Sequence, residues 1–93
     1  MTQEWTSEIW ATIRPEEAAA LHAAILAAHA QHDLERLVDL YAIAADSKEV
    51  EGDVDATCFF LTQAFVFALE AGAARAHELN RRLVAYGRAW PLE

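Results

Sequence analysis

The chain has 93 residues, a formal net charge of −8, and a hydrophobic content of 55%. This length fits one domain with a modest core, and so apolar a chain with only three glycines and two prolines is not disordered. The negative charge argues against binding to nucleic-acid phosphates, and the single cysteine excludes an internal disulfide.

The first segment, residues 2–14, spaces Trp5, Ile9 and Ile13 four residues apart. This spacing predicts a short amphipathic helix or arm that covers one end of the core. No basic stretch followed by an apolar one marks the segment for secretion, so we expect a cytoplasmic protein.

Two helices are predicted next in the chain. Pro15 followed by two glutamates is typical of a helix start, because proline lacks an N–H and acids favour the positive helix end. We predict a helix over residues 15–31 and a second one over residues 34–50, capped by Asp33. One long helix from Pro15 is the alternative, since neither glycine nor proline marks the junction.

Three histidines share the bulky face of the predicted helix 15–31, namely His22, His29 and His32. Only His29 and His32 are spaced to chelate one metal ion together, because His22 lies too far along the helix axis. A metal would need further ligands that no motif supplies, so we expect no cofactor. Packing histidines and a pH-sensitive interface are the other interpretations.

The stretch Asp53–Ala71 contains all four phenylalanines and the only cysteine, and it is predicted to be the central helix. Its apolar residues cover an arc of about 220°, which is too wide for a single neighbour. We therefore expect at least two packed neighbours and a core that includes Phe60 and Phe67 as buried side chains. The uncharged run is shorter than a bilayer span, so no membrane insertion is expected.

Phe59 and Val66 break the pattern of this helix, because both lie among polar residues that include Gln63. An apolar pair in a polar frame predicts a contact with a protein partner, most simply a second copy in a two-fold homodimer. Contact with the N-terminal arm of the same chain is the alternative.

The last predicted helix runs from Ala73 to Trp90 and carries a basic outer face. Residues 1–71 contain thirteen acids and three bases, whereas residues 72–93 contain four arginines and two acids. This split predicts that Arg81 and Arg82 meet acids of the same chain or of a partner. A solvated basic face is the alternative.

The run Phe60-x-x-Gln63-Ala64-x-x-Phe67 resembles the first-helix signature of tetratricopeptide repeats, and Tyr41 with Ala44 resembles the second helix of that family. Gln63 departs from the family pattern, and Asn80 stands where the family has an aromatic residue. The resemblance implies antiparallel helical hairpins that form a non-catalytic scaffold, which binds protein segments mostly through its first helices.

No catalytic signature is present, because the two serines lack a neighbouring histidine and no glycine-rich loop could hold a phosphate. We predict a single all-α domain over residues 1–93, with two antiparallel hairpins of four main helices plus a short N-terminal helix or arm. The predicted function is a non-enzymatic protein–protein interaction module. One alternative is a small acidic inhibitor or regulator of a basic partner, favoured if the acidic segment 46–55 is unpaired. The other is a metal-binding bundle that uses the histidines.

Overall fold

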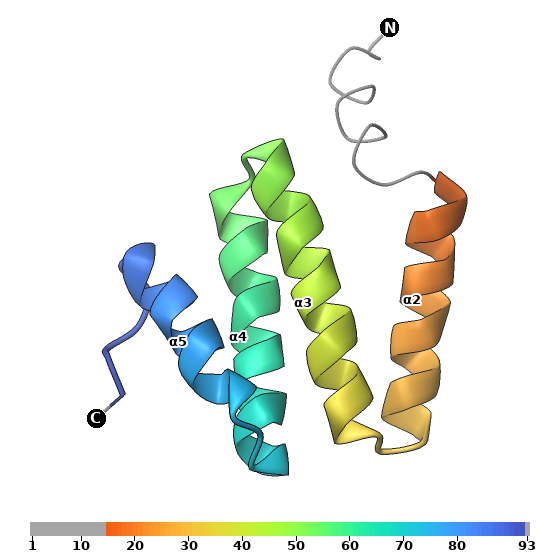
Figure 1. Ribbon diagram of the computed structural model, residues 1–93. Coiled ribbons are helices and arrows are strands. Elements are labelled where there is room, and N and C mark those ends of the chain that lie inside the picture. Colours follow the sequence, from red (N-terminus) through yellow and green to blue (C-terminus); the bar gives the residue numbers. More distant parts are fainter. Residues whose placement is uncertain (1–14, 93) are drawn as a thin grey trace, which may run out of the picture.

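The computed structural model describes residues 15–92, and all regular secondary structure in this range is helical (Figure 1). The four helices are α2 (Pro15–Ala30), α3 (Leu34–Glu51), α4 (Val54–Ala71) and α5 (Arg75–Ala85). The predicted all-α class with four main helices is thereby confirmed. The predicted helix or arm over residues 2–14 lies outside the described residues.

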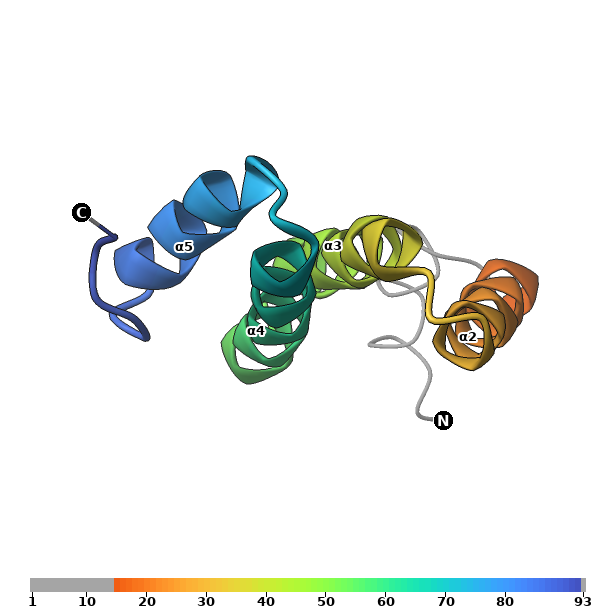
Figure 2. The same cartoon turned by 90° about the horizontal axis from the view of Figure 1, so that it is seen from below.

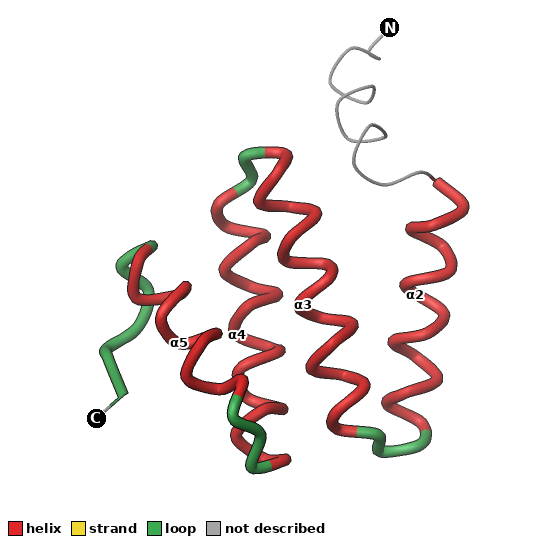
Figure 3. Tube along the Cα trace, in the orientation of Figure 1, coloured by secondary structure: helices red, strands yellow, loops and turns green. Residues whose placement is uncertain are grey.

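Local sequence signals set most of the helix ends. The Asp33 and Asp53 carboxylates accept hydrogen bonds from backbone N–H groups in the first turns of α3 and α4, which confirms both predicted N-caps. Gly52 and Gly72 end α3 and α4 in the left-handed conformation. The short loops of Figure 3 follow from these signals.

The junction between α2 and α3 shows that residues 15–50 form two helices rather than one. His32 adopts a left-handed φ of 54°, and the Asp33 N–H donates to the Ala28 carbonyl at 3.0 Å. This bond satisfies a carbonyl at the end of α2, while Asp33 caps α3. The chain therefore reverses here without glycine or proline.

The helices lie side by side in a thin layer, in the order α2, α3, α4, α5 (Figure 1). The described residues span 47 × 32 × 14 Å, so the layer is little thicker than one helix. Seen from below, α2 and α4 lie toward one face of the layer, and α3 and α5 lie toward the other (Figure 2). The most extensive contact joins α3 to α4, the two helices that the sequence assigned to different hairpins.

Two clusters of buried residues form the core. The larger joins α3, α4 and α5 and consists of Val38, Ala45, Cys58, Leu61, Ala64, Ala68, Ala76, Leu79 and Leu83. The smaller joins α2 to α3 and consists of Ala28, Leu37 and Leu40. As predicted, α4 packs against two neighbouring helices.

The expectation that Phe60 and Phe67 are buried core residues was wrong, because both are only partly buried. Instead, α4 turns Leu61, Ala64 and Ala68 toward its neighbours, and each is 0% exposed. Alanine at a helix contact allows the two axes to approach closely. The phenylalanines are displaced to the flank of that contact.

The last helix is shorter than predicted, because α5 ends at Ala85 instead of Trp90. Gly87 has a φ of 75°, and the Gly87 and Arg88 N–H groups donate to the Val84 and Leu83 carbonyls at 2.8 and 2.9 Å. This arrangement closes a helix C-terminus around a left-handed residue. Trp90 is consequently 88% exposed and does not continue the apolar stripe of α5.

Among the described residues, α4 is the one helix whose length and composition alone would allow it to cross a membrane. A core helix of a soluble protein can pass the same test, so this finding is weak evidence. Of its 18 residues, 28% are buried. The remainder includes the exposed side chains of Phe59 and Val66, which belong to the surface described next.

Candidate interaction surface

Five aromatic rings from three helices form a continuous series, which we name the aromatic row: Phe59, Phe60, Tyr41, Phe67 and His29. Successive ring centroids lie 5.3, 6.2, 5.9 and 5.5 Å apart. Tyr41 of α3 stacks on Phe60 and on Phe67, both from α4, with interplanar angles of 27° and 8°. Such offset or edge-on pairs at these distances are favourable contacts. The row therefore links α2, α3 and α4 across one side of the layer.

Helix periodicity places these rings. Phe60 and Phe67 are seven residues apart and so share one flank of α4, where Tyr41 fits beside both. From α2, His29 contacts Tyr41 and Phe67 edge to face, and its Nε2 is 2.9 Å from the Tyr41 hydroxyl. His29 thus joins the end of α2 to a surface formed mainly by α3 and α4.

Both ends of the aromatic row are accessible, because Phe59 is 57% exposed and His29 is also exposed. Val66 is 43% exposed and lies seven residues after Phe59, on the same side of α4. Among their neighbours, Gln63 is partly buried and Thr62 donates to the Cys58 carbonyl at 2.8 Å. We name Phe59, Thr62, Gln63, Val66 and Glu70 the outer face of α4. The structure leaves its apolar pair uncovered by any described part of the chain.

Ion pairs between α5 and α3 join the two helices on the other side of the layer. Arg82 contacts Asp46 at 2.9 Å and Glu49 at 3.0 Å, and Arg75 contacts Asp39 at 2.6 Å. Around the axis of α3, Asp39 and Asp46 point about 160° and 140° away from Tyr41. The contacts of Asp39 and Asp46 therefore lie away from the aromatic row, whereas Glu49, about 80° from Tyr41, lies between the two.

The acids of α3 also change the proton affinity of their partners. Partial burial alone lowers the pKa of Arg82, but hydrogen bonds and charges of Asp46 and Glu49 outweigh it, so the pKa is raised. The Tyr86 hydroxyl donates to Glu49, and this hydrogen bond raises the pKa of Tyr86. Glu49 thus accepts hydrogen bonds from two side chains, Arg82 of α5 and Tyr86 just after it.

The remaining two arginines of residues 72–93, Arg81 of α5 and Arg88 just after this helix, differ in their surroundings. Arg88 pairs with Asp55 at 2.8 Å, and the hydrogen bond to that carboxylate raises the pKa of Arg88. The predicted pairing with acids of the same chain is therefore confirmed for Arg82, and Arg75 and Arg88 form such pairs as well. Arg81 is exposed and has no ion pair among the described residues.

The two candidate metal ligands are not arranged on one helix face. His29 is hydrogen-bonded to Tyr41, whereas His32 lies in the left-handed turn after α2. Within residues 15–92, no group of three or more His, Cys, Asp or Glu side chains could hold a metal ion. The structure gives the histidine pair no additional ligands.

The sequence predicted Phe59, Val66 and Gln63 as partner-binding residues but did not show that Tyr41, Phe67 and His29 continue a series of rings that begins at Phe59. A signal was available, because His29 lies on the bulky face of its helix and Tyr41 on the apolar stripe of the next. Which flank of α4 those faces meet is decided by tertiary packing. No family model, curated protein or solved structure matches this chain.

Proposed function

We propose that the protein is a non-catalytic protein–protein interaction module that binds its partner through the outer face of α4 and the adjoining aromatic row. The observation that carries this proposal is the exposure of Phe59 and Val66 beside a continuous series of rings. Aromatic side chains set in a polar rim are typical of the centre of a protein interface. We infer a cytoplasmic setting from the sequence alone.

The arrangement of the helices supports a tetratricopeptide-like scaffold. In this interpretation α2 with α3 and α4 with α5 act as two antiparallel hairpins, and α2 and α4 are their first helices. Both lie toward the same face of the layer (Figure 2), which is also the arrangement that the resemblance implies for partner binding. The contact between α3 and α4 then serves as the interface between the two hairpins.

The alternative of an acidic inhibitor is less well supported. That function requires free carboxylates along residues 46–55, but Asp46 and Glu49 pair with Arg82 of α5, and Asp55 pairs with Arg88 just after it. These acids contribute to holding α5 on the body of the domain. Their pairing favours the interaction module.

We propose a second copy of the chain as the partner, with the two α4 helices side by side about a two-fold axis. A net charge of −8 opposes self-association in general. The outer face of α4, however, carries Glu70 near its C-terminal end, and Asp55 at its other end is paired with Arg88. A two-fold contact there brings Phe59 and Val66 of one copy against the same pair of the other.

The test is the molar mass of the full chain in solution, measured by size-exclusion chromatography with light scattering. We expect a dimer for the wild type and a monomer for Phe59→Glu, because a buried unpaired carboxylate is strongly unfavourable. Ile43→Glu is the matched control, since Ile43 is 51% exposed on α3 and its variant stays dimeric. A wild type that is monomeric at high concentration, or a dimeric Phe59→Glu, would contradict the homodimer.

A further inference from the structure

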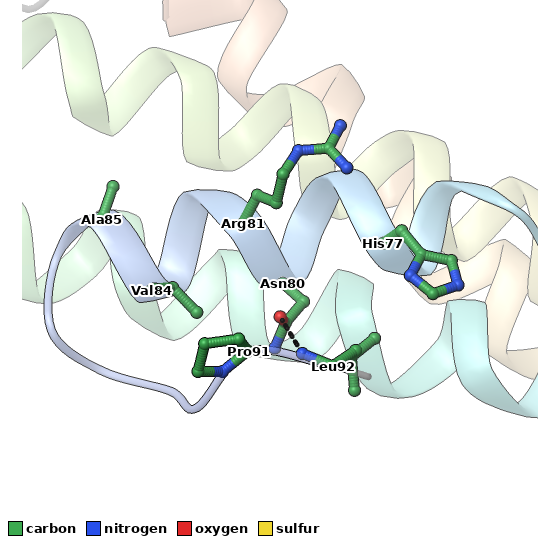
Figure 4. A pocket seen from close by; sticks show the side chains of 7 residues that line it. All are labelled: His77, Asn80, Arg81, Val84, Ala85, Pro91 and Leu92. Carbon is green, nitrogen blue, oxygen red and sulfur yellow. Dashed lines mark hydrogen bonds between the residues drawn. The ribbon is translucent and has the colours of Figure 1, made fainter.

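A hollow of about 470 Å³ lies on α5, on an element separate from the aromatic row (Figure 4). Side chains of α5 line it together with the C-terminal segment that folds back along the helix. Figure 4 shows Val84 and Asn80 beside Pro91 and Leu92, with His77 farther along the helix and the Arg81 side chain extending from the opposite edge of α5. The hollow thus combines an apolar wall with three nitrogen-bearing side chains, those of His77, Asn80 and Arg81.

Asn80 holds the C-terminal segment in place. Its Nδ2 donates to the Trp90 carbonyl at 3.1 Å, and its Oδ1 accepts from the Leu92 N–H at 3.1 Å. The residue is 4% exposed, so the loss of either bond would leave a buried polar group unsatisfied. Asn80 therefore makes Pro91 and Leu92 a fixed wall of the hollow.

The charges of α5 indicate what the hollow binds. Arg75, Arg82 and Arg88 each have a carboxylate at 2.6–2.9 Å, whereas Arg81 has none among the described residues. Arg81 and His77 are four residues apart and so lie on successive turns of one face. Glu78, the acid closest to them in sequence, is 3.7 Å from Arg75. A carboxylate from a partner molecule would give Arg81 the ion pair that the other three arginines already have.

We propose that this hollow binds a segment of an acidic protein partner, in which an aspartate or glutamate is followed by an aliphatic residue. The carboxylate pairs with the Arg81 guanidinium and accepts a hydrogen bond from the His77 ring. The aliphatic side chain packs on Val84 and Pro91. Because the hollow is open, a free small acid would stay mostly solvated, whereas a peptide continues along the surface.

The site is tested by titrating the full ¹⁵N-labelled chain with the peptide acetyl-Ala-Glu-Val-Leu-amide and following backbone amide signals. We expect shifts confined to residues 77–85 and 89–92. The glutamine version of the peptide and Arg81→Gln protein should each bind about tenfold more weakly, the loss of one charge-assisted hydrogen bond. Arg75→Gln is the matched control and should bind like the wild type, because Arg75 is engaged by Asp39.

Three results would overturn the proposal: no shift at millimolar peptide, equal binding of the glutamine peptide, or unchanged binding by Arg81→Gln. Phe59→Glu protein should bind the peptide like the wild type, since Phe59 lies on α4. The failure of this site is therefore distinguishable from the failure of the homodimer.

Discussion

Truncating Leu61 should destabilise the protein more than truncating Phe67, although phenylalanine is the larger residue. Leu61 is 0% exposed and lies in the cluster that joins α3, α4 and α5. Replacing a fully buried leucine by alanine removes its transfer energy and leaves a cavity, so Leu61→Ala should cost about 3–4 kcal/mol. Phe67 is partly exposed, and its truncation should cost about 2 kcal/mol, mainly from the Tyr41 and His29 contacts.

Urea denaturation measures both costs, provided that the slope of unfolding free energy against urea is unchanged between variants. Val54→Ala is the control within the same helix, because a side chain that is 42% exposed and outside both the outer face of α4 and the aromatic row should contribute less than about 1 kcal/mol. If Phe67→Ala costs as much as Leu61→Ala or more, the principal core is at the aromatic row and the packing argument is wrong.

Three further changes test the contacts of α5. Arg82→Gln removes the pairs with Asp46 and Glu49 and should lower the unfolding free energy by about 1 kcal/mol at low salt. This loss should shrink in 1 M NaCl, and a loss that does not depend on salt would contradict its origin in ion pairs. The pKa of Tyr86 is raised in the folded state, so its contribution is present below the unfolded tyrosine pKa of about 10 and is lost as pH rises through the folded pKa. Thermal melts should therefore show wild-type stability falling above about pH 10 more steeply than that of Tyr86→Phe, and parallel curves would count against the Glu49 contact. Gly87→Ala should lower the unfolding free energy, measured by chemical denaturation, by about 1 kcal/mol. A Cβ meets no neighbour there, so only the positive φ of residue 87 is strained. A neutral result would mean that α5 does not end in this left-handed turn.

The sequence determined the features that depend on neighbours along the chain. Asp33 and Asp53 cap the helices that follow them, and Gly52 and Gly72 end the helices before them, because these interactions span only a few residues. The wide apolar arc of α4 likewise required more than one neighbour. Gly87 gave the same local signal, but the apolar spacing from Leu83 to Trp90 favoured a longer helix.

Only the tertiary structure decided which side chains meet between helices. The sequence showed aromatic residues on α4, yet their burial depended on how closely Ala64 and Ala68 let the neighbouring helices approach. The charge split predicted pairing for α5 without distinguishing Arg82, which meets two acids, from Arg81, which meets none in the described chain. Such choices depend on helix rotation and spacing, which are set by the packing of all four helices together, and no local pattern encodes them.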